Sequence, residues 1–118
     1  MKNLVALFVL LLQLPLQAQT SNHTKALESA VIQFNKTNSP SSYIQLFQQF
    51  EQLYAVDKTN WLIPYYAGMT KSLMCLLKMG DRDALASDAL LWVARAISIE
   101  VNDDIYCAES LAYTAKLS

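Results

Sequence analysis

Apolar residues recur with helical spacing along five stretches of the chain after residue 20. Residues three or four positions apart lie on one side of an α-helix, so this pattern indicates amphipathic helices around a shared core. In the first stretch these apolar residues are Leu27, Ala30, Val31 and Phe34. We therefore predict helices over about 27–34, 40–55, 61–79, 84–100 and 105–117, preceded by a loose lead-in at 20–23.

Residues suited to helix ends stand at the predicted boundaries. Ser39 followed by Pro40 is typical of an N-cap and first helical position. Asn60 is suited to cap the third helix, and Gly80 is the expected stop at its end. Asp81 or Asp83 then favours the positive end of the fourth helix. In that fourth helix the predicted packing face contains three alanines, which indicates a helix enclosed by close neighbours: Ala86, Ala89 and Ala96.

Composition narrows the class further. The chain is 53% hydrophobic and 16% charged, which excludes a disordered chain, and it holds only two glycines and three prolines. Few glycines favour helices over hairpins and phosphate-binding loops. The formal net charge is −1, so no strong field attracts nucleic acid or anionic lipid, and we expect no nucleic-acid partner.

The first eighteen residues form a separate segment. Lys2 gives a positive start, nine consecutive apolar residues follow over 4–12, and Pro15 and Ala18 precede an expected cleavage. Nine residues are too few to cross a membrane, which takes about 20. We predict a cleavable signal peptide at 1–18 and an exported domain at 19–118, soluble in the periplasm or secreted, with no membrane-spanning segment after cleavage.

The two cysteines, Cys75 and Cys107, both fall within apolar helical stretches. Free cysteine is among the most frequently buried residues, so we expect two small core side chains. Export would permit a Cys75–Cys107 disulfide, which is the alternative. No Cys or His cluster is spaced to hold a metal, and we predict neither a metal nor a cofactor.

The segment 89–113 resembles the tetratricopeptide repeat, a helix-turn-helix unit of about 34 residues that stacks into a solenoid. The similarity lies in small and large residues at the family's packing positions, namely Ala89, Val93, Ala96, Ile97, Ile99, Tyr106, Ser110 and Tyr113, and in the turn at Asn102 and Asp103. The segment 61–67 with the acidic turn and alanine-rich helix after it also resembles small exported bacterial repeat proteins of unassigned activity. Val93 and Val101 replace the family's aromatic residue and proline, and Gly68 follows Trp61 by seven residues instead of four. The resemblance implies an all-α, right-handed array of antiparallel helix pairs with a protein-binding habit.

Catalytic residues are scarce. His23 is the only histidine and falls in the predicted lead-in, where we expect a solvated side chain. The aspartates of the two turns, at 81–83 and 103–104, fit helix capping or solvated positions better than a metal loop. No nucleophile or phosphate-binding motif is present, so we predict no enzyme activity and no catalytic residues.

Aromatic residues carry the functional hypothesis. Tyr and Trp dominate protein-binding hot spots, although most such rings pack in cores. The candidate partner-binding residues are Trp61, Tyr65, Tyr66, Trp92 and Tyr106. Trp92 stands beside the alanine face, where it either covers a neighbouring helix or is exposed. We predict a non-catalytic adaptor for an unidentified protein or peptide. The alternative is a small ligand carrier with a pocket among Trp61, Tyr66, Met69 and Trp92.

The last predicted helix leaves apolar residues without cover, namely Leu111, Tyr113 and Leu117. Solenoids normally protect a terminal repeat with a polar capping helix. Three interpretations follow: a truncated repeat protein, self-association through this open edge, or a bundle whose last helix folds back on the first.

Overall fold

The computed structural model describes residues 22–118, and every regular element within them is a helix. A helix over 22–36 is followed by α2 (Pro40–Val56), α3 (Leu62–Leu76), α4 (Arg82–Ile99) and α5 (Asp103–Leu117). The predicted all-α class and the five helices are confirmed. The predicted loose lead-in at 20–23 was wrong for residues 22 and 23, which are already helical. The predicted signal peptide at 1–18 lies outside the described residues.

Side-chain caps hold the starts of α2, α4 and α5. At α3 the N-cap residue is Trp61, which makes no such bond, and the predicted Asn60 instead accepts from the Leu62 N–H through its Oδ1 (3.1 Å). The Ser39 hydroxyl accepts from the Ser42 N–H (3.4 Å), with Pro40 as the first residue of α2. Asp81 Oδ2 accepts from the Ala84 N–H (2.9 Å) at α4. At α5, Asn102 Oδ1 accepts from the Ile105 N–H (3.0 Å). Each cap satisfies an amide that the helix leaves without a partner, which fixes where that helix begins.

The end of α3 differs from the sequence prediction. Lys78 adopts the left-handed conformation with φ of 57°, whereas Gly80 does not have a positive φ. The Lys78 N–H donates to the Cys75 carbonyl (3.0 Å) and the Met79 N–H donates to the Met74 carbonyl (3.1 Å). This is the hydrogen-bond pattern of a Schellman motif. The expectation that Gly80 stops the helix was wrong, because those two bonds place the left-handed residue two positions earlier.

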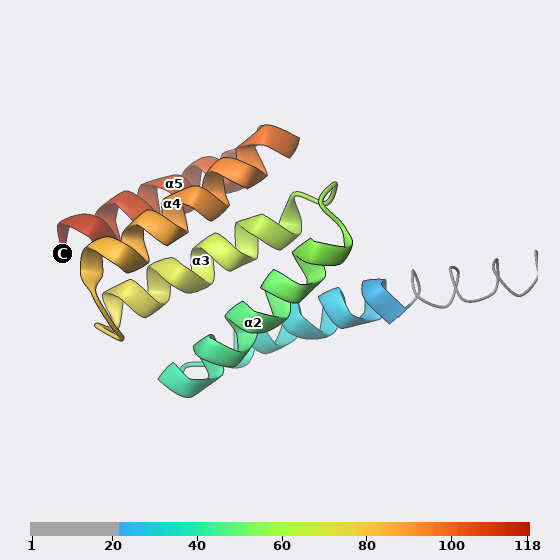
Figure 1. The fold of residues 1–118 in the computed structure, drawn as a ribbon, viewed down its shortest axis with the longest axis horizontal. Helices are drawn as coiled ribbons and strands as arrows, with labels where there is room; N and C mark the ends of the chain where they lie inside the picture. Colours follow the sequence, from blue (N-terminus) through green and yellow to red (C-terminus); the bar gives the residue numbers. More distant parts are fainter. Residues whose placement is uncertain (1–21) are drawn as a thin grey trace, which may run out of the picture.

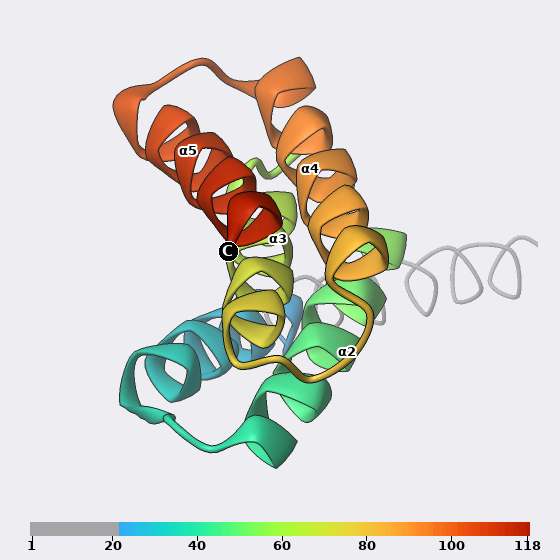
Figure 2. The same cartoon turned by 90° about the vertical axis from the view of Figure 1, so that its left-hand side faces the viewer.

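α3 is the central helix of the array. It packs against α2, α4 and α5, and α4 also packs against α5. Successive helices run antiparallel (Figure 1), and the helix over 22–36 and α5 lie on the opposite side of α3 from α2 and α4 (Figure 2). This packing is consistent with an array of helix pairs.

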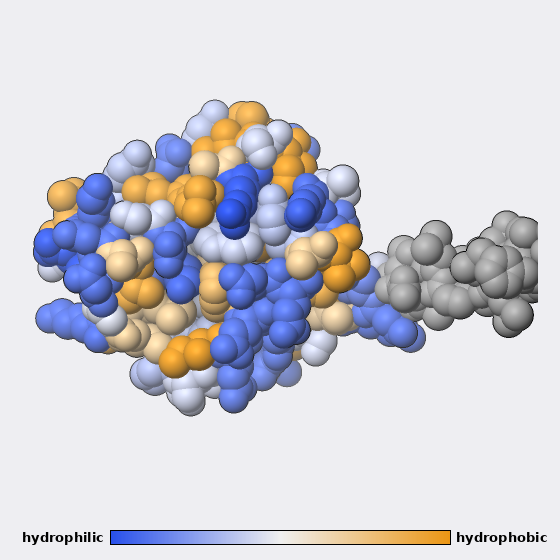
Figure 3. All heavy atoms as spheres, viewed as in Figure 1, coloured by the Kyte–Doolittle hydropathy of each residue, from blue (hydrophilic) through white to orange (hydrophobic). Residues whose placement is uncertain are grey.

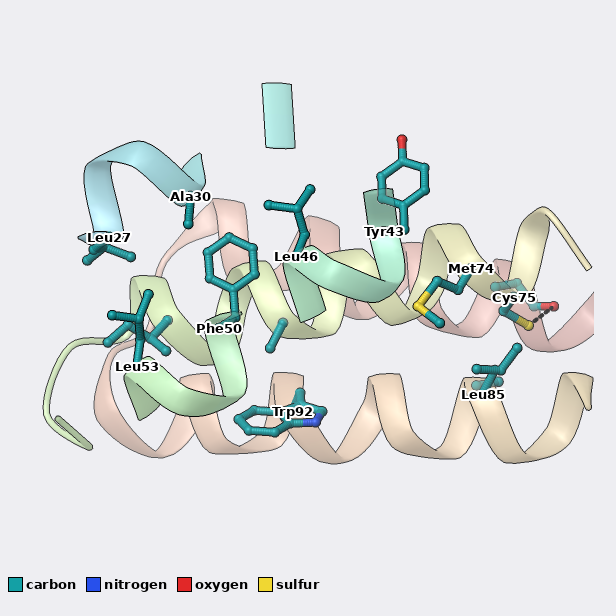
Figure 4. Packing of buried hydrophobic residues seen from close by; sticks show 14 residues of the cluster. Leu27, Ala30, Tyr43, Leu46, Phe50, Leu53, Met74, Cys75, Leu85 and Trp92 are labelled. Atoms are coloured by element: carbon teal, nitrogen blue, oxygen red, sulfur yellow. Dashed lines mark hydrogen bonds between the residues drawn. The ribbon is translucent and has the colours of Figure 1, made fainter. Parts of the chain in front are cut away.

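Two buried clusters fill the array. The larger one, which we call the ring cluster, joins all the described helices, with Ala115 from α5, and its buried members include Phe50, Leu46 and Trp92 (Figure 4). The smaller one, the small-residue cluster, joins α4 to α5 through Val93, Ala96, Ile105 and Ala108. The predicted close approach of α4 to its neighbours is confirmed by its alanines, which are fully buried: Ala86, Ala89 and Ala96.

Candidate functional site

One side of α3 is apolar along its whole length yet only half-buried. We call these residues the α3 stripe: Leu62, Tyr65, Tyr66, Met69, Leu73 and Leu76. Their spacing places them on a single side of the helix. The only charged residue of α3, Lys71, lies on the opposite side, where its Nζ is 4.2 Å from the Phe47 ring centroid and 3.6 Å from Asp88 Oδ2. The stripe is therefore an uncharged surface in a helix that is otherwise buried.

Two helices flank the α3 stripe. On one side Phe34, from the helix over 22–36, packs edge-on against Tyr66, with ring centroids 5.2 Å apart. On the other side α5 brings Asp104 and Cys107 close enough to affect the ionisation of Tyr65. Because both flanking helices lie on the side of α3 away from α2 and α4 (Figure 2), they border the stripe without closing over it.

An apolar hollow of about 460 Å³ lies at the Leu62 end of the α3 stripe. Its other lining residues all come from the helix over 22–36: Thr24, Leu27, Glu28, Val31 and Ile32. Ile32 is 53% exposed, a high value for a large aliphatic side chain. The helical spacing of apolar residues did not predict this region, because that spacing identifies only the residues of the helix that face the core. Ile32, next to Val31 and outside that face, was the available signal.

Contacts between rings hold the aromatic part of the stripe in place. Tyr66 stacks on Phe50 with centroids 5.6 Å apart, and Tyr65 meets Tyr66 edge-on at 4.9 Å. Trp61, just before α3, packs edge-on against Tyr65 at 5.5 Å. Such ring contacts are worth about 0.5–1.5 kcal/mol each beyond simple burial. Three of the five candidate binding residues, Trp61, Tyr65 and Tyr66, therefore lie together.

The two adjacent tyrosines are harder to ionise than usual. Burial raises the pKa of Tyr65 above its ordinary value, and negative charge on Tyr66, Asp104 and Cys107 raises it further. Burial also raises the pKa of Tyr66, with a smaller contribution from Asp104. Both hydroxyls therefore remain protonated at neutral pH and can donate hydrogen bonds to a bound group.

The other two candidates lie elsewhere. Trp92 is only 6% exposed and packs edge-on against Phe47 (5.7 Å) and Tyr54 (5.2 Å) of α2, with the Arg95 guanidinium 4.4 Å from its ring centroid. Of its two predicted positions, Trp92 thus takes the one that covers a neighbouring helix. Tyr106 is 49% exposed on α5 and is not part of the α3 stripe.

The face formed by α2, α3 and α4 shows apolar atoms in separate patches among hydrophilic ones (Figure 3).

His23 and the cysteines differ from expectation. His23 is half-buried, and its Nε2 donates to the Leu53 carbonyl (3.1 Å), tying the first described helix to α2; the expected solvated side chain was wrong. Cys75 is buried as predicted, with its Sγ 3.6 Å from the Ala115 carbonyl oxygen. Cys107 is exposed, so its predicted core position was wrong, and both thiols are free instead of forming the alternative disulfide.

Within residues 22–118 no three His, Cys, Asp or Glu side chains gather as a metal site would require. No helix in the same range is both long and apolar enough to cross a membrane. Comparison of the chain with protein-family models, with curated proteins and with solved structures gave no match.

Proposed function

We propose that this protein is an exported, non-catalytic, tetratricopeptide-like interaction module that binds an apolar segment of another protein along the α3 stripe. The observation that carries the proposal is the stripe itself, which presents six half-buried apolar residues without one charge. Contiguous apolar surface bordered by polar residues is typical of protein interaction sites. The paired helices support the repeat-like architecture, and the pattern over residues 1–18 supports export.

The size of the stripe suits a helical partner segment. From Leu62 to Leu76 is fourteen helical steps, or about 21 Å at about 1.5 Å per residue. An amphipathic helix of about four turns has the same length and presents anchors at the same spacing. The Tyr65 and Tyr66 hydroxyls then offer hydrogen bonds to the polar edge of that helix.

Site-specific photo-crosslinking tests this proposal. A photoreactive phenylalanine analogue replaces Tyr65 on the stripe or, as the control, Leu91, which is 52% exposed on α4. We expect one protein to be crosslinked reproducibly through position 65 in the native envelope and not through position 91. The same crosslinked products from both positions, or none from position 65, would refute binding along the stripe.

The apolar hollow favours one second candidate, a carrier of a small apolar ligand. Its volume of about 460 Å³ lies in the range of small-molecule sites, roughly 300–1,000 Å³. It is lined by Leu27, Val31 and Ile32 and not by the four residues first considered for a carrier pocket. Native mass spectrometry of the purified protein separates the two functions. A carrier retains a bound small molecule that Ile32→Glu releases, whereas the interaction module loses the partner crosslinked through position 65 on Met69→Glu and retains no such molecule.

A further inference from the structure

The outer side of α5 carries a short apolar seam that no other described element covers. We define the α5 seam as Tyr106, Ser110, Tyr113 and Leu117. Tyr106, Tyr113 and Leu117 are 49%, 53% and 85% exposed, and Ser110 is also exposed. The residues that attach α5 to the array lie on the other side of the helix: Ile105, Ala108, Ala112 and Ala115.

The spacing of the seam is that of a coiled coil. Its residues are separated by four, three and four positions, the alternation that keeps side chains along the contact line of two paired helices. Asp103, three residues before Tyr106, continues the same line at the start of α5. We infer that the α5 seam pairs antiparallel with the α5 seam of a second copy of this chain.

Shape supports the antiparallel arrangement. When two copies of α5 are aligned in opposite directions about the middle of the seam, Tyr106 lies opposite Leu117 of the second copy. Ser110 then lies opposite Tyr113 of that copy, a small residue facing a large one. Because a two-fold axis relates the two copies, each of these two contacts occurs twice. This is expected of an interface made from the same surface patch on each subunit.

Charge selects the same direction. Glu109 and Lys116 flank the seam on one side, seven residues apart. In the antiparallel alignment Glu109 of each copy lies beside Lys116 of the other, giving two opposite-charge pairs. A parallel alignment would instead place Asp103 against Asp103 of the second copy, and like charges in contact disfavour that arrangement. Neither Glu109 nor Lys116 takes part in the ion pairs within residues 22–118, which are Lys71–Asp88 and Arg82–Asp83.

This pairing is independent of the proposed function. Tyr106 and Tyr113 lie on a different side of α5 from Cys107, which lies near Tyr65 at the border of the α3 stripe. A dimer through the α5 seam therefore leaves the stripe open in both copies. With three large side chains from each copy the interface is small, and we expect a dissociation constant between about 1 and 100 µM.

Sedimentation equilibrium of the purified protein, from about 1 µM to about 1 mM, tests this inference. We expect a monomer–dimer equilibrium that Tyr113→Glu weakens at least about tenfold. The matched control is Leu91→Glu, which replaces a comparably exposed apolar residue on α4 and is expected to change the dissociation constant less than about twofold. Circular dichroism melts of each variant verify that the helices remain folded.

Charge exchange tests the direction of pairing. Glu109→Lys alone and Lys116→Glu alone each place like charges together twice in the dimer, and each is expected to weaken it about fivefold or more. The double variant exchanges both charges and is expected to restore the dimer. If the chain stays monomeric to about 1 mM, the inference is overturned. This holds whether the seam remains exposed to solvent or another segment covers it. The inference is also overturned by a dimer insensitive to Tyr113→Glu, or by single-variant effects that the double variant does not reverse.

Discussion

α3 packs against its neighbours in two different ways. Toward α2 and the helix over 22–36 the space is filled by rings, such as Phe50 stacked on Tyr66 at 5.6 Å. Toward α4 the backbone comes so close that a Cβ on Gly68 would lie 2.8 Å from Val93 Cγ2 and 3.2 Å from the Ala89 carbonyl oxygen. Large side chains occupy the wide spaces between helices, and small ones allow the close crossings.

This difference predicts opposite sensitivities to mutation. Loss of a ring from the first interface leaves a cavity, and the surrounding side chains collapse only partly into it. Addition of atoms to the second interface forces the backbones apart, because there is no unoccupied volume to receive them. The following predictions, from the largest effect to the smallest, test whether the two interfaces differ in this way.

Phe50→Ala should have the largest effect. Phe50 is fully buried in the ring cluster, so truncation removes its contact with Tyr66 and leaves a cavity. We expect a loss of about 3–5 kcal/mol in the free energy of unfolding, measured by urea denaturation. Leu91→Ala, at an exposed position on α4, is the control and should change that energy by less than about 0.5 kcal/mol. A loss below about 1 kcal/mol for Phe50→Ala would mean that the ring cluster is loosely packed.

Gly68→Leu tests the close crossing of α3 and α4. The added side chain would overlap Val93 and the backbone at Ala89, and we expect a loss of about 2–3 kcal/mol in the free energy of unfolding. Gly80→Ala is the control, because its new Cβ would meet Leu85 Cδ1 at 3.4 Å, an ordinary contact. If both variants are equally stable, α3 and α4 do not approach as closely as the structure indicates.

Ser72→Ala sharpens the comparison from the opposite direction, because it should stabilise the protein. Ser72 is fully buried on the same side of α3 as Gly68, and its Oγ has no hydrogen-bond partner among the described residues. Removal of an unsatisfied hydroxyl should raise the free energy of unfolding by about 1 kcal/mol. Ser87→Ala, at an exposed position of α4, controls for the better helix propensity of alanine. A destabilised Ser72→Ala variant would show that the hydroxyl has a partner after all.

Alkaline pH should have the smallest effect on the free energy of unfolding. It acts on two adjacent tyrosines that pack with different clusters. Tyr66 packs with the ring cluster and Tyr65 with the small-residue cluster. Because folding raises both pKa values above the ordinary 10.0, the folded state retains the two protons more tightly than the unfolded chain does. The resulting stability is fully present below pH 10.0 and is lost as the pH rises through the folded-state values.

The measurement for this prediction is the urea midpoint as a function of pH, from about 8 to 11. The double variant Tyr65→Phe with Tyr66→Phe should lose less stability over this range than the natural protein does. Both rings are partly open to solvent, so we expect a difference below about 1 kcal/mol. Equal slopes for the two proteins would show that neither hydroxyl is perturbed by folding.

The positions of the helices along the chain follow from local signals in the sequence. The apolar spacing, together with caps at Ser39 and Asp81, predicts where helices form and begin, because those interactions involve neighbouring residues. The Asn102 cap of α5 is equally local but was not predicted. The close packing of α4 was also predictable, since small residues such as Ala89 and Ala96 permit close approach to other helices. These predictions depend only on side-chain size and period.

The candidate binding surface depends on distant residues and was therefore only partly predictable. The α3 stripe has the same apolar spacing as a core face, and only the positions of α5 and the helix over 22–36 leave it incompletely buried. The sequence alone does not decide whether Trp92 is exposed or covers a neighbouring helix. Its contacts with Phe47 and Tyr54 of α2 decide this. Likewise the turn at Lys78 depends on which carbonyls of α3 accept its hydrogen bonds, which residue preferences alone do not specify.

The difference in exposure between the two cysteines allows the natural protein to be labelled at a single position. Cys107 is exposed and Cys75 is buried, so a thiol-reactive fluorophore should attach at one defined position without any engineered residue. That position lies near Tyr65, at the edge of the α3 stripe, and one residue after Tyr106 of the α5 seam. A single label would therefore give an optical signal for a segment bound along the α3 stripe, while the sides of Tyr106 and Tyr113 that would pair with a second copy stay unlabelled.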